Sequence, residues 1–192
     1  MPDRFTPSLD RLSDAQESEL KTWVQASLRE GNRLPTYAEL ECRMPLEAQQ
    51  NNIVFSLTPG ELDFRYIHMG KTVLANTYGD YTGQKLADMP GKGPGSLIWQ
   101  FVCDIARQRQ PSISVVPYVG PSADWSHVSA LGLPAADDGV NVTHVILSIN
   151  FVAWPFLKET SDVRDKTNSL RKYLFEIYDR TIDKITDSLR ER

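Results

Sequence analysis

The alternation of apolar and polar positions predicts a helix near the start of the chain. Ser13 and Gln16 form a capping-box pattern, and Gly31 is a residue that commonly ends helices. Between them apolar residues recur at helical spacing, which predicts one buried helix face. That face is expected to contain Leu20, Trp23, Val24, Ser27 and Leu28. A second capping box at Thr36 and Glu39 predicts a short helix that ends near Arg43.

The middle of the chain has the period-two patterns and turn residues of a β-sheet. The strands are expected at about 52–57, 63–69, 113–118, 125–133 and 142–151. The first two form a hairpin in which Phe64, Tyr66 and His68 share one face. A short helix is expected at 71–78 and a longer one after Ser96, and they separate this hairpin from the remaining three strands. The last strand is the most apolar, so we expect it in the centre of the sheet.

A long amphipathic helix is expected at the C-terminal end, over about residues 162–190. Its apolar stripe is Leu170, Leu174, Ile177, Tyr178, Ile182, Ile185 and Leu189. Such a stripe can pair with a second chain or dock on the rest of the same chain. The chain thus divides into a mobile arm (1–12), an N-terminal helical cap (13–48), a core (49–156) and a C-terminal helix (157–192).

Composition and charge narrow the function classes. The 192 residues have a net charge of −4 and a pI of about 5.4, which argues against nucleic-acid binding because that usually needs a basic face. The longest apolar stretch, Val145–Phe156, is shorter than a membrane span of roughly 20 residues. The first residues lack a secretory signal pattern, and Cys42 and Cys103 lack metal-ligand spacing. A cytoplasmic protein with reduced thiols, without nucleic-acid or membrane partners, is expected.

Two motifs carry a family resemblance. The strand Asp63-Phe64-Arg65-Tyr66 is followed by the turn Gly70-Lys71-Thr72 and by the loop Asp80-Tyr81-Thr82-Gly83. With the helix around Trp23 and the following Leu34-Pro35, they resemble a family of short bacterial PAS-domain proteins over about residues 17–152. The chain departs from the family pattern at Tyr78 and Gly79, where that family often has a glycine and an arginine.

The resemblance implies an α+β fold, in which a PAS-like five-stranded antiparallel sheet has helices on one face. It is flanked by the N-terminal helix and the long C-terminal helix. Such a fold often encloses a cavity that holds a small ligand. The candidate lining is Phe55, Tyr66, His68, Leu74, Trp99, Cys103, Val115, His127 and His144. Aromatic and aliphatic residues at these positions also fill a core that has no ligand, so both interpretations stay open.

Cofactors of the family are not indicated by the sequence. The segment 97–108 has no histidine to ligate haem, and Cys103 does not lie in the motif of the flavin light sensors. The three strand histidines are more typical of hydrogen-bonded residues than of metal ligands, so no metal is expected. The cofactor is therefore unknown, with haem and flavin disfavoured.

The function expected from the sequence is that of a sensor or adaptor without enzymatic activity. It would bind a small molecule, a signalling protein or both, and would transmit the signal through its flanking helices. A homodimer is expected through Leu20, Trp23, Leu170, Leu174, Ile177, Ile182 and Ile185. The alternative is a dimerisation or scaffold module with a filled core and no ligand. An enzyme would need a cluster of groups with displaced pKa values in a cleft.

Overall fold

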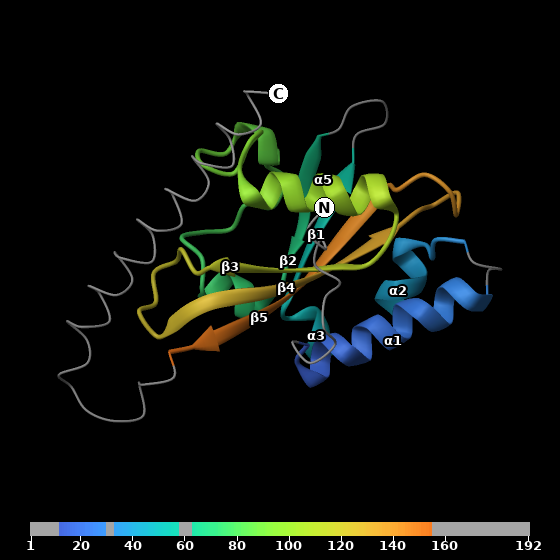
Figure 1. Cartoon of the computed structure of the whole chain (residues 1–192), viewed down its shortest axis with the longest axis horizontal. Helices are drawn as coiled ribbons and strands as arrows, with labels where there is room; N and C mark the ends of the chain where they lie inside the picture. Colours follow the sequence, from blue (N-terminus) through green and yellow to red (C-terminus); the bar gives the residue numbers. More distant parts are fainter. Residues whose placement is uncertain (1–11, 30–32, 58–62, 155–192) are drawn as a thin grey trace, which may run out of the picture.

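The computed structural model describes residues 12–29, 33–57 and 63–154. Its centre is a five-stranded antiparallel sheet with the strand order β2-β1-β5-β4-β3 (Figure 1). The strands are β1 (Asn52–Leu57), β2 (Phe64–Met69), β3 (Ser112–Pro117), β4 (Trp125–Ala135) and β5 (His144–Ala153). The α+β class and the antiparallel sheet are confirmed, and so is the central place of the last strand. The strand β5 is paired on both edges, and its first half is almost fully buried. Its apolar composition suits this central place.

Helices lie on both faces of the sheet (Figure 1). One face, here called the α5 face, is covered by α4 (Lys71–Ala75), the 3-10 helix η2 (Leu86–Asp88) and α5 (Leu97–Gln108). The opposite face, here called the α1 face, is covered by α1 (Asp14–Arg29), α2 (Tyr37–Arg43) and α3 (Leu46–Gln49). The N-terminal cap is therefore a second layer that buries the other side of the sheet. The short helix α3 was not predicted from the sequence.

The predicted helix starts are confirmed by their capping hydrogen bonds. The backbone N–H of Gln16 donates to the Ser13 hydroxyl over 3.3 Å, and the Ser13 N–H donates to Gln16 Oε1 over 3.1 Å. Thr36 and Ser96 cap α2 and α5 in the same way, since each hydroxyl accepts a backbone N–H three residues later. Each cap satisfies a donor that a helix start otherwise leaves without a partner.

The face assignment of the β1–β2 hairpin differs from the prediction at its end. Val54 pairs with His68, but the next residue, Phe55, pairs with Tyr66, so Ile67 is an extra residue in β2. Such a bulge reverses the alternation of side chains beyond it. Tyr66 therefore faces the α5 side, as Met69 does, whereas His68 lies on the α1 face beside Val54.

The buried face of α1 also differs from the predicted stripe. Trp23 is buried and Leu20 packs beside it, but Val24 and Leu28 are 41% and 63% exposed. The helix instead buries Gln16, Glu19 and Ala26. The prediction counted apolar residues alone and therefore placed the buried face of the helix incorrectly. Two residues of the observed buried face, Gln16 and Glu19, are polar.

Gly70 of the Gly70-Lys71-Thr72 turn is required by close packing. A Cβ atom there would overlap the backbone of Gln49 and Gln50, and the Gly70 N–H donates to the Asn52 carbonyl over 2.8 Å. We expect Gly70→Ala to lower the free energy of unfolding by about 1–3 kcal/mol, the range for overpacked sites. Urea denaturation would measure the loss.

The matched control is Gly79→Ala, since nothing lies within 4 Å of a Cβ at Gly79. Its effect should stay within about 0.5 kcal/mol. Equal losses in the two variants would contradict the packing explanation for Gly70.

Most of the predicted arm (1–12) and the whole predicted C-terminal helix (157–192) lie outside the described residues. Among the described residues, no helix is both long and apolar enough to cross a membrane.

Candidate functional site

Five of the nine predicted lining residues lie together on the α5 face. Phe55, Tyr66 and Cys103 are buried in its core, and Leu74 and Trp99 pack against that core. The ring centroids of Phe55 and Tyr66 are 4.5 Å apart, and those of Phe64 and Trp99 are 5.5 Å apart. The sequence thus identified a group of neighbouring residues, and their role in binding stays a prediction.

These side chains pack against one another in the space where a ligand was expected. Phe55 is fully buried between Phe64 and Tyr66, and Ile105 of α5 packs into the gap left by Gly132 of β4. Burial raises the pKa of the Cys103 thiol, so this thiol stays protonated at neutral pH. This arrangement is that of a close-packed core.

The other four predicted residues lie on the α1 face, so the nine cannot line one cavity. His68 Nε2 lies 3.3 Å from the Gln49 carbonyl oxygen, and His144 stacks on Tyr37 with ring centroids 5.0 Å apart. The Ser126 hydroxyl lies 2.8 Å from His127 Nδ1, and Val115 of β3 is 45% exposed.

The histidines do not form a metal site with one another. Burial lowers the pKa of His127 and of His144, although Asp137 offsets part of the change at His144. Both rings are therefore neutral at pH 7. The described part of the chain contains no cluster of three or more His, Cys, Asp or Glu residues that could hold a metal ion.

The two motifs of the family resemblance lie side by side in the structure. The loop Asp80–Gly83 runs along β2, where Gly83 N–H donates to the Tyr66 carbonyl over 2.8 Å and Tyr66 N–H donates to the Gln84 carbonyl over 3.0 Å. The Asp63 carboxylate lies 2.7 Å from Lys85 Nζ. These contacts cover β2, which is an edge strand of the sheet. Both motifs therefore have a structural role that needs no ligand.

A buried polar group holds α1 on the sheet. Gln16, only 1% exposed, donates from Nε2 to the carbonyl oxygens of Ser129 and Ser148 over 3.0 and 2.9 Å. Trp23 Nε1 donates to the Pro134 carbonyl over 2.7 Å. The docked position of α1 therefore depends on specific hydrogen bonds as well as on apolar contact.

The Glu19 carboxyl is the least satisfied member of this group. Glu19 is fully buried, and Asn52 Nδ2 donates to its Oε1 over 2.9 Å. Within the described residues, Glu19 Oε2 and Asn52 Oδ1 have no hydrogen-bond partner. Burial raises the pKa of Glu19, and the side chains of Ser148 and Asn52 offset part of that rise. An incompletely paired buried carboxyl opposes the docking of the helix that carries it.

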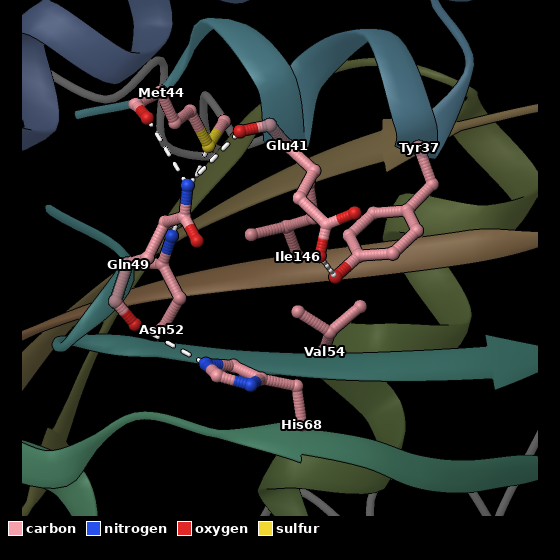
Figure 2. Close-up of a pocket in the computed structure, with 8 residues that line it drawn as sticks. All are labelled: Tyr37, Glu41, Met44, Gln49, Asn52, Val54, His68 and Ile146. Atoms are coloured by element: carbon pink, nitrogen blue, oxygen red, sulfur yellow. Dashed lines mark hydrogen bonds between the residues drawn. The ribbon is translucent and has the colours of Figure 1, made fainter. Parts of the chain in front are cut away.

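A small cleft lies beside Asn52, between α2–α3 and the sheet (Figure 2). Its volume is about 20 Å³, which is room for one water-sized group. It is here called the α2–α3 cleft, and its lining is Tyr37, Glu41, Met44, Gln49, Asn52, Val54, His68 and Ile146. His68 is the only candidate from the sequence that lines it. Asn52 connects this cleft directly to Glu19 of α1.

Sequence reasoning missed the polar residues of this region. Gln16 and Glu19 are spaced by three and share a helix face with Trp23 and Ala26, so their spacing was a usable signal. Asn52 carried no comparable signal, because a polar residue at a strand start is usually exposed.

The predicted dimer contacts fall into two groups. Leu20 and Trp23 pack in the chain's own α1-face core. Leu170, Leu174, Ile177, Ile182 and Ile185 lie outside the described residues. Dimerisation stays a prediction.

Comparison with known proteins gives no family. No family model matches the chain, and no curated protein matches it. Among solved structures, the chain is similar to an IcIR transcriptional regulator from Alicyclobacillus acidocaldarius, with 12% sequence identity and a TM-score of 0.30. The match covers 85% of this chain and 66% of the regulator, so the chain spans less than two thirds of that protein. A similarity of this size identifies no common function.

Proposed function

We propose that the chain is a PAS-type sensor or adaptor domain without catalytic activity. It binds a small molecule, a partner protein or both, and it responds by changing the docking of helix α1. The proposal combines the motif resemblance with the five-stranded antiparallel sheet that this resemblance implies and the polar docking of α1. The observation that carries it is the fully buried carboxyl of Glu19, of which only Oε1 has a hydrogen-bond partner within the described residues.

Helix α1 has two positions in this proposal, one docked on the sheet and one released from it. Apolar contact through Trp23 and Ala26 favours the docked position of α1, and burial of Glu19 opposes it. A ligand that changes the surroundings of Asn52 alters the balance, because Asn52 bonds directly to Glu19. A ligand can shift such an equilibrium by the difference between its affinities for the two positions.

The second candidate is an interaction module with a filled core, and the aromatic packing of the α5 face favours it. Phe55, Phe64 and Tyr66 occupy the region where a PAS-type ligand was expected. In this case α1 is a constant structural layer, and the protein acts through its outer surface as the homodimer that the sequence predicts.

Two measurements on the full chain separate these candidates. A panel of metabolites is first screened for a rise in melting temperature. A ligand that binds only the folded protein at one hundred times its Kd adds about 2.7 kcal/mol of stability. Hydrogen–deuterium exchange of residues 14–29 is then measured with and without each stabilising compound.

The sensor proposal expects exchange in α1 to change at least severalfold on binding, with no comparable change in the paired strand β5. Stabilisation without a change in α1 would contradict signalling through this helix. A panel without any stabilising compound would favour the interaction module.

A further inference from the structure

The two edge strands of the sheet differ in what covers their outer sides. The outer side of β2 is occupied by residues 83–85, through backbone hydrogen bonds at Tyr66 and a β-bridge between Arg65 and Lys85. The strand at the other edge, β3, pairs only with β4 among the described residues (Figure 1). An edge strand without a cover presents unpaired backbone groups to the surroundings. Within the described part of the chain, the sheet therefore has one open edge, and that edge is β3.

The register between β3 and β4 determines which backbone groups of β3 point away from the sheet. Just beyond β3, Tyr118 N–H donates to the Ser126 carbonyl over 3.3 Å, and the pairing continues back through β3 without a shift. Successive residues of a strand direct their backbone groups to opposite sides, so the even-numbered residues of β3 bond to β4 as Tyr118 does. The odd-numbered residues Ile113, Val115 and Pro117 therefore direct their carbonyl oxygens outward. The first two also direct an N–H outward.

The side chains of β3 do little to prevent pairing with another strand. Its six residues carry no charge, and its register has no bulge. Val115 lies in the middle of the strand and is 45% exposed. Charged side chains, bulges and prolines are the usual protections of an edge strand. Of these β3 has only Pro117, which removes one N–H at the end of the strand and leaves those of Ile113 and Val115 available.

The charges on either side of β3 favour a second copy of this chain as the partner. Arg107 and Arg109 are exposed just before the strand, and Asp124 is exposed after the turn that follows it. The sequence between Arg109 and Asp124 has no charged residue. An antiparallel second copy brings the arginines of each chain towards the aspartate of the other, whereas a parallel copy places like charges together. The pattern is thus complementary to itself in the antiparallel direction.

From these observations we propose that β3 pairs antiparallel with β3 of a second copy of this chain. Pairing Val115 with the partner's Val115 uses both outward groups of that residue, and Ile113 N–H then donates to the carbonyl of the partner's Pro117. Because β2 is covered, each chain offers one open edge within the described residues, so association stops at a two-fold dimer. The pairing does not depend on the proposed sensor function, and it uses other residues than the dimer contacts predicted from the sequence.

The first test measures the mass of the full-length chain against concentration by analytical ultracentrifugation. We expect a monomer–dimer equilibrium without larger species. Val115→Lys should weaken dimerisation about tenfold or more, because it places two like charges at directly paired positions of neighbouring strands. Val140→Lys is the matched control, since Val140 is 46% exposed and lies outside β3. It should leave dimerisation unchanged.

The second test needs no variant, so it holds even if Val115→Lys does not fold. Hydrogen exchange of the backbone amides is measured by NMR at concentrations above and below the midpoint of association. The Ile113 and Val115 amides should gain protection at least severalfold at the higher concentration. The Ser114 and Val116 amides face β4 within one chain, so their protection should be the same at both concentrations.

The third test concerns the direction of the pairing. Arg109→Asp and Asp124→Arg should each weaken dimerisation about threefold, as expected for exposed ion pairs. The double variant exchanges the two charges and should restore the dimer, because each aspartate again faces an arginine of the other chain. Additive weakening in the double variant would contradict the antiparallel arrangement.

Several other outcomes would overturn the inference. A chain that stays monomeric at all concentrations leaves the edge to a strand of a different protein. Protection of the Ile113 and Val115 amides at the lowest concentration would show that the same chain already covers the edge. A dimer that Val115→Lys and Val140→Lys affect equally, or that protects other residues and not these two amides, uses another surface. None of these outcomes bears on the response of α1 to a ligand, so failure of this pairing and failure of the proposed function are distinguishable.

Discussion

Replacing Phe55 with alanine should lower the free energy of unfolding by about 3–5 kcal/mol, the range measured when a large aromatic side chain is removed from a core. Phe55 is fully buried at the middle of β1 and packs against Phe64 and Tyr66. It is paired with Tyr66 on one side and with Val145 of the central strand on the other. Because these neighbours belong to paired strands, they cannot collapse fully into the space that the ring leaves.

The control for this variant is Tyr78→Ala. Tyr78 is 73% exposed, so its removal should change stability by no more than about 0.5 kcal/mol. Urea unfolding of the two variants and the parent chain, followed by circular dichroism, measures the difference. Similar losses at Phe55 and Tyr78 would contradict the close packing of the α5 face.

The Phe55 variant also distinguishes a filled core from a ligand cavity. An apolar cavity made by truncation stays dry and can bind a small apolar molecule. Benzene should therefore raise the melting temperature of Phe55→Ala and leave the parent chain unchanged. An equal rise in the parent chain would show that the α5 face already has room for a ligand.

The sequence predicted the order and kind of most described elements because their signals are local. Capping residues such as Ser13 and Ser96 set helix starts through hydrogen bonds to residues three positions away. The apolar composition of β5 predicted its central place, since a strand paired on both edges and covered on both faces needs apolar residues throughout. Such features need no knowledge of distant contacts.

The candidate site was predicted only in part, because its geometry depends on features that period-two reasoning cannot detect. The extra residue Ile67 places His68 on the opposite face from Tyr66, and no turn residue or composition change marks it. Glu19 and Asn52 meet across 33 positions of sequence, so neither residue indicates the other. The bulge places His68 in the lining of the cleft, and Asn52 connects the cleft to Glu19. Because both features depend on distant parts of the chain, the cleft was found only in the structure.

Glu19→Gln should stabilise the protein most at neutral and alkaline pH. The uncharged amide keeps an oxygen that can accept from Asn52 Nδ2, and it removes the desolvation cost of a buried carboxylate. We expect a gain of about 1–3 kcal/mol at pH 8, the usual cost of leaving a buried polar group unsatisfied. Chemical unfolding at fixed pH measures this gain. Glu17→Gln is the control, because Glu17 lies on the exposed face of the same helix and forms an ion pair with the exposed Lys21.

The pH dependence of the parent chain follows from the same carboxyl. Burial raises the pKa of Glu19 in the folded state above its ordinary value of 4.5, so the folded protein binds a proton that the unfolded chain has already released. Stability from this group is therefore complete below about pH 4.5 and is lost as pH rises through the folded-state pKa. Above that pKa the carboxylate is ionised in both states, and the contribution stays lost.

A proton on Glu19 Oε2 supplies a donor that the ionised form lacks, and Asn52 Oδ1 of the same pair is an acceptor without a partner among the described residues. The docked position of α1 should therefore be most stable when Glu19 is protonated. Hydrogen exchange of residues 14–29, corrected for the intrinsic pH effect, should show protection that decreases as pH rises, whereas Glu19→Gln should keep its protection throughout. Equal pH dependence in the two proteins would show that Glu19 does not control the helix, and the proposed route from Asn52 to α1 would then lose its physical basis.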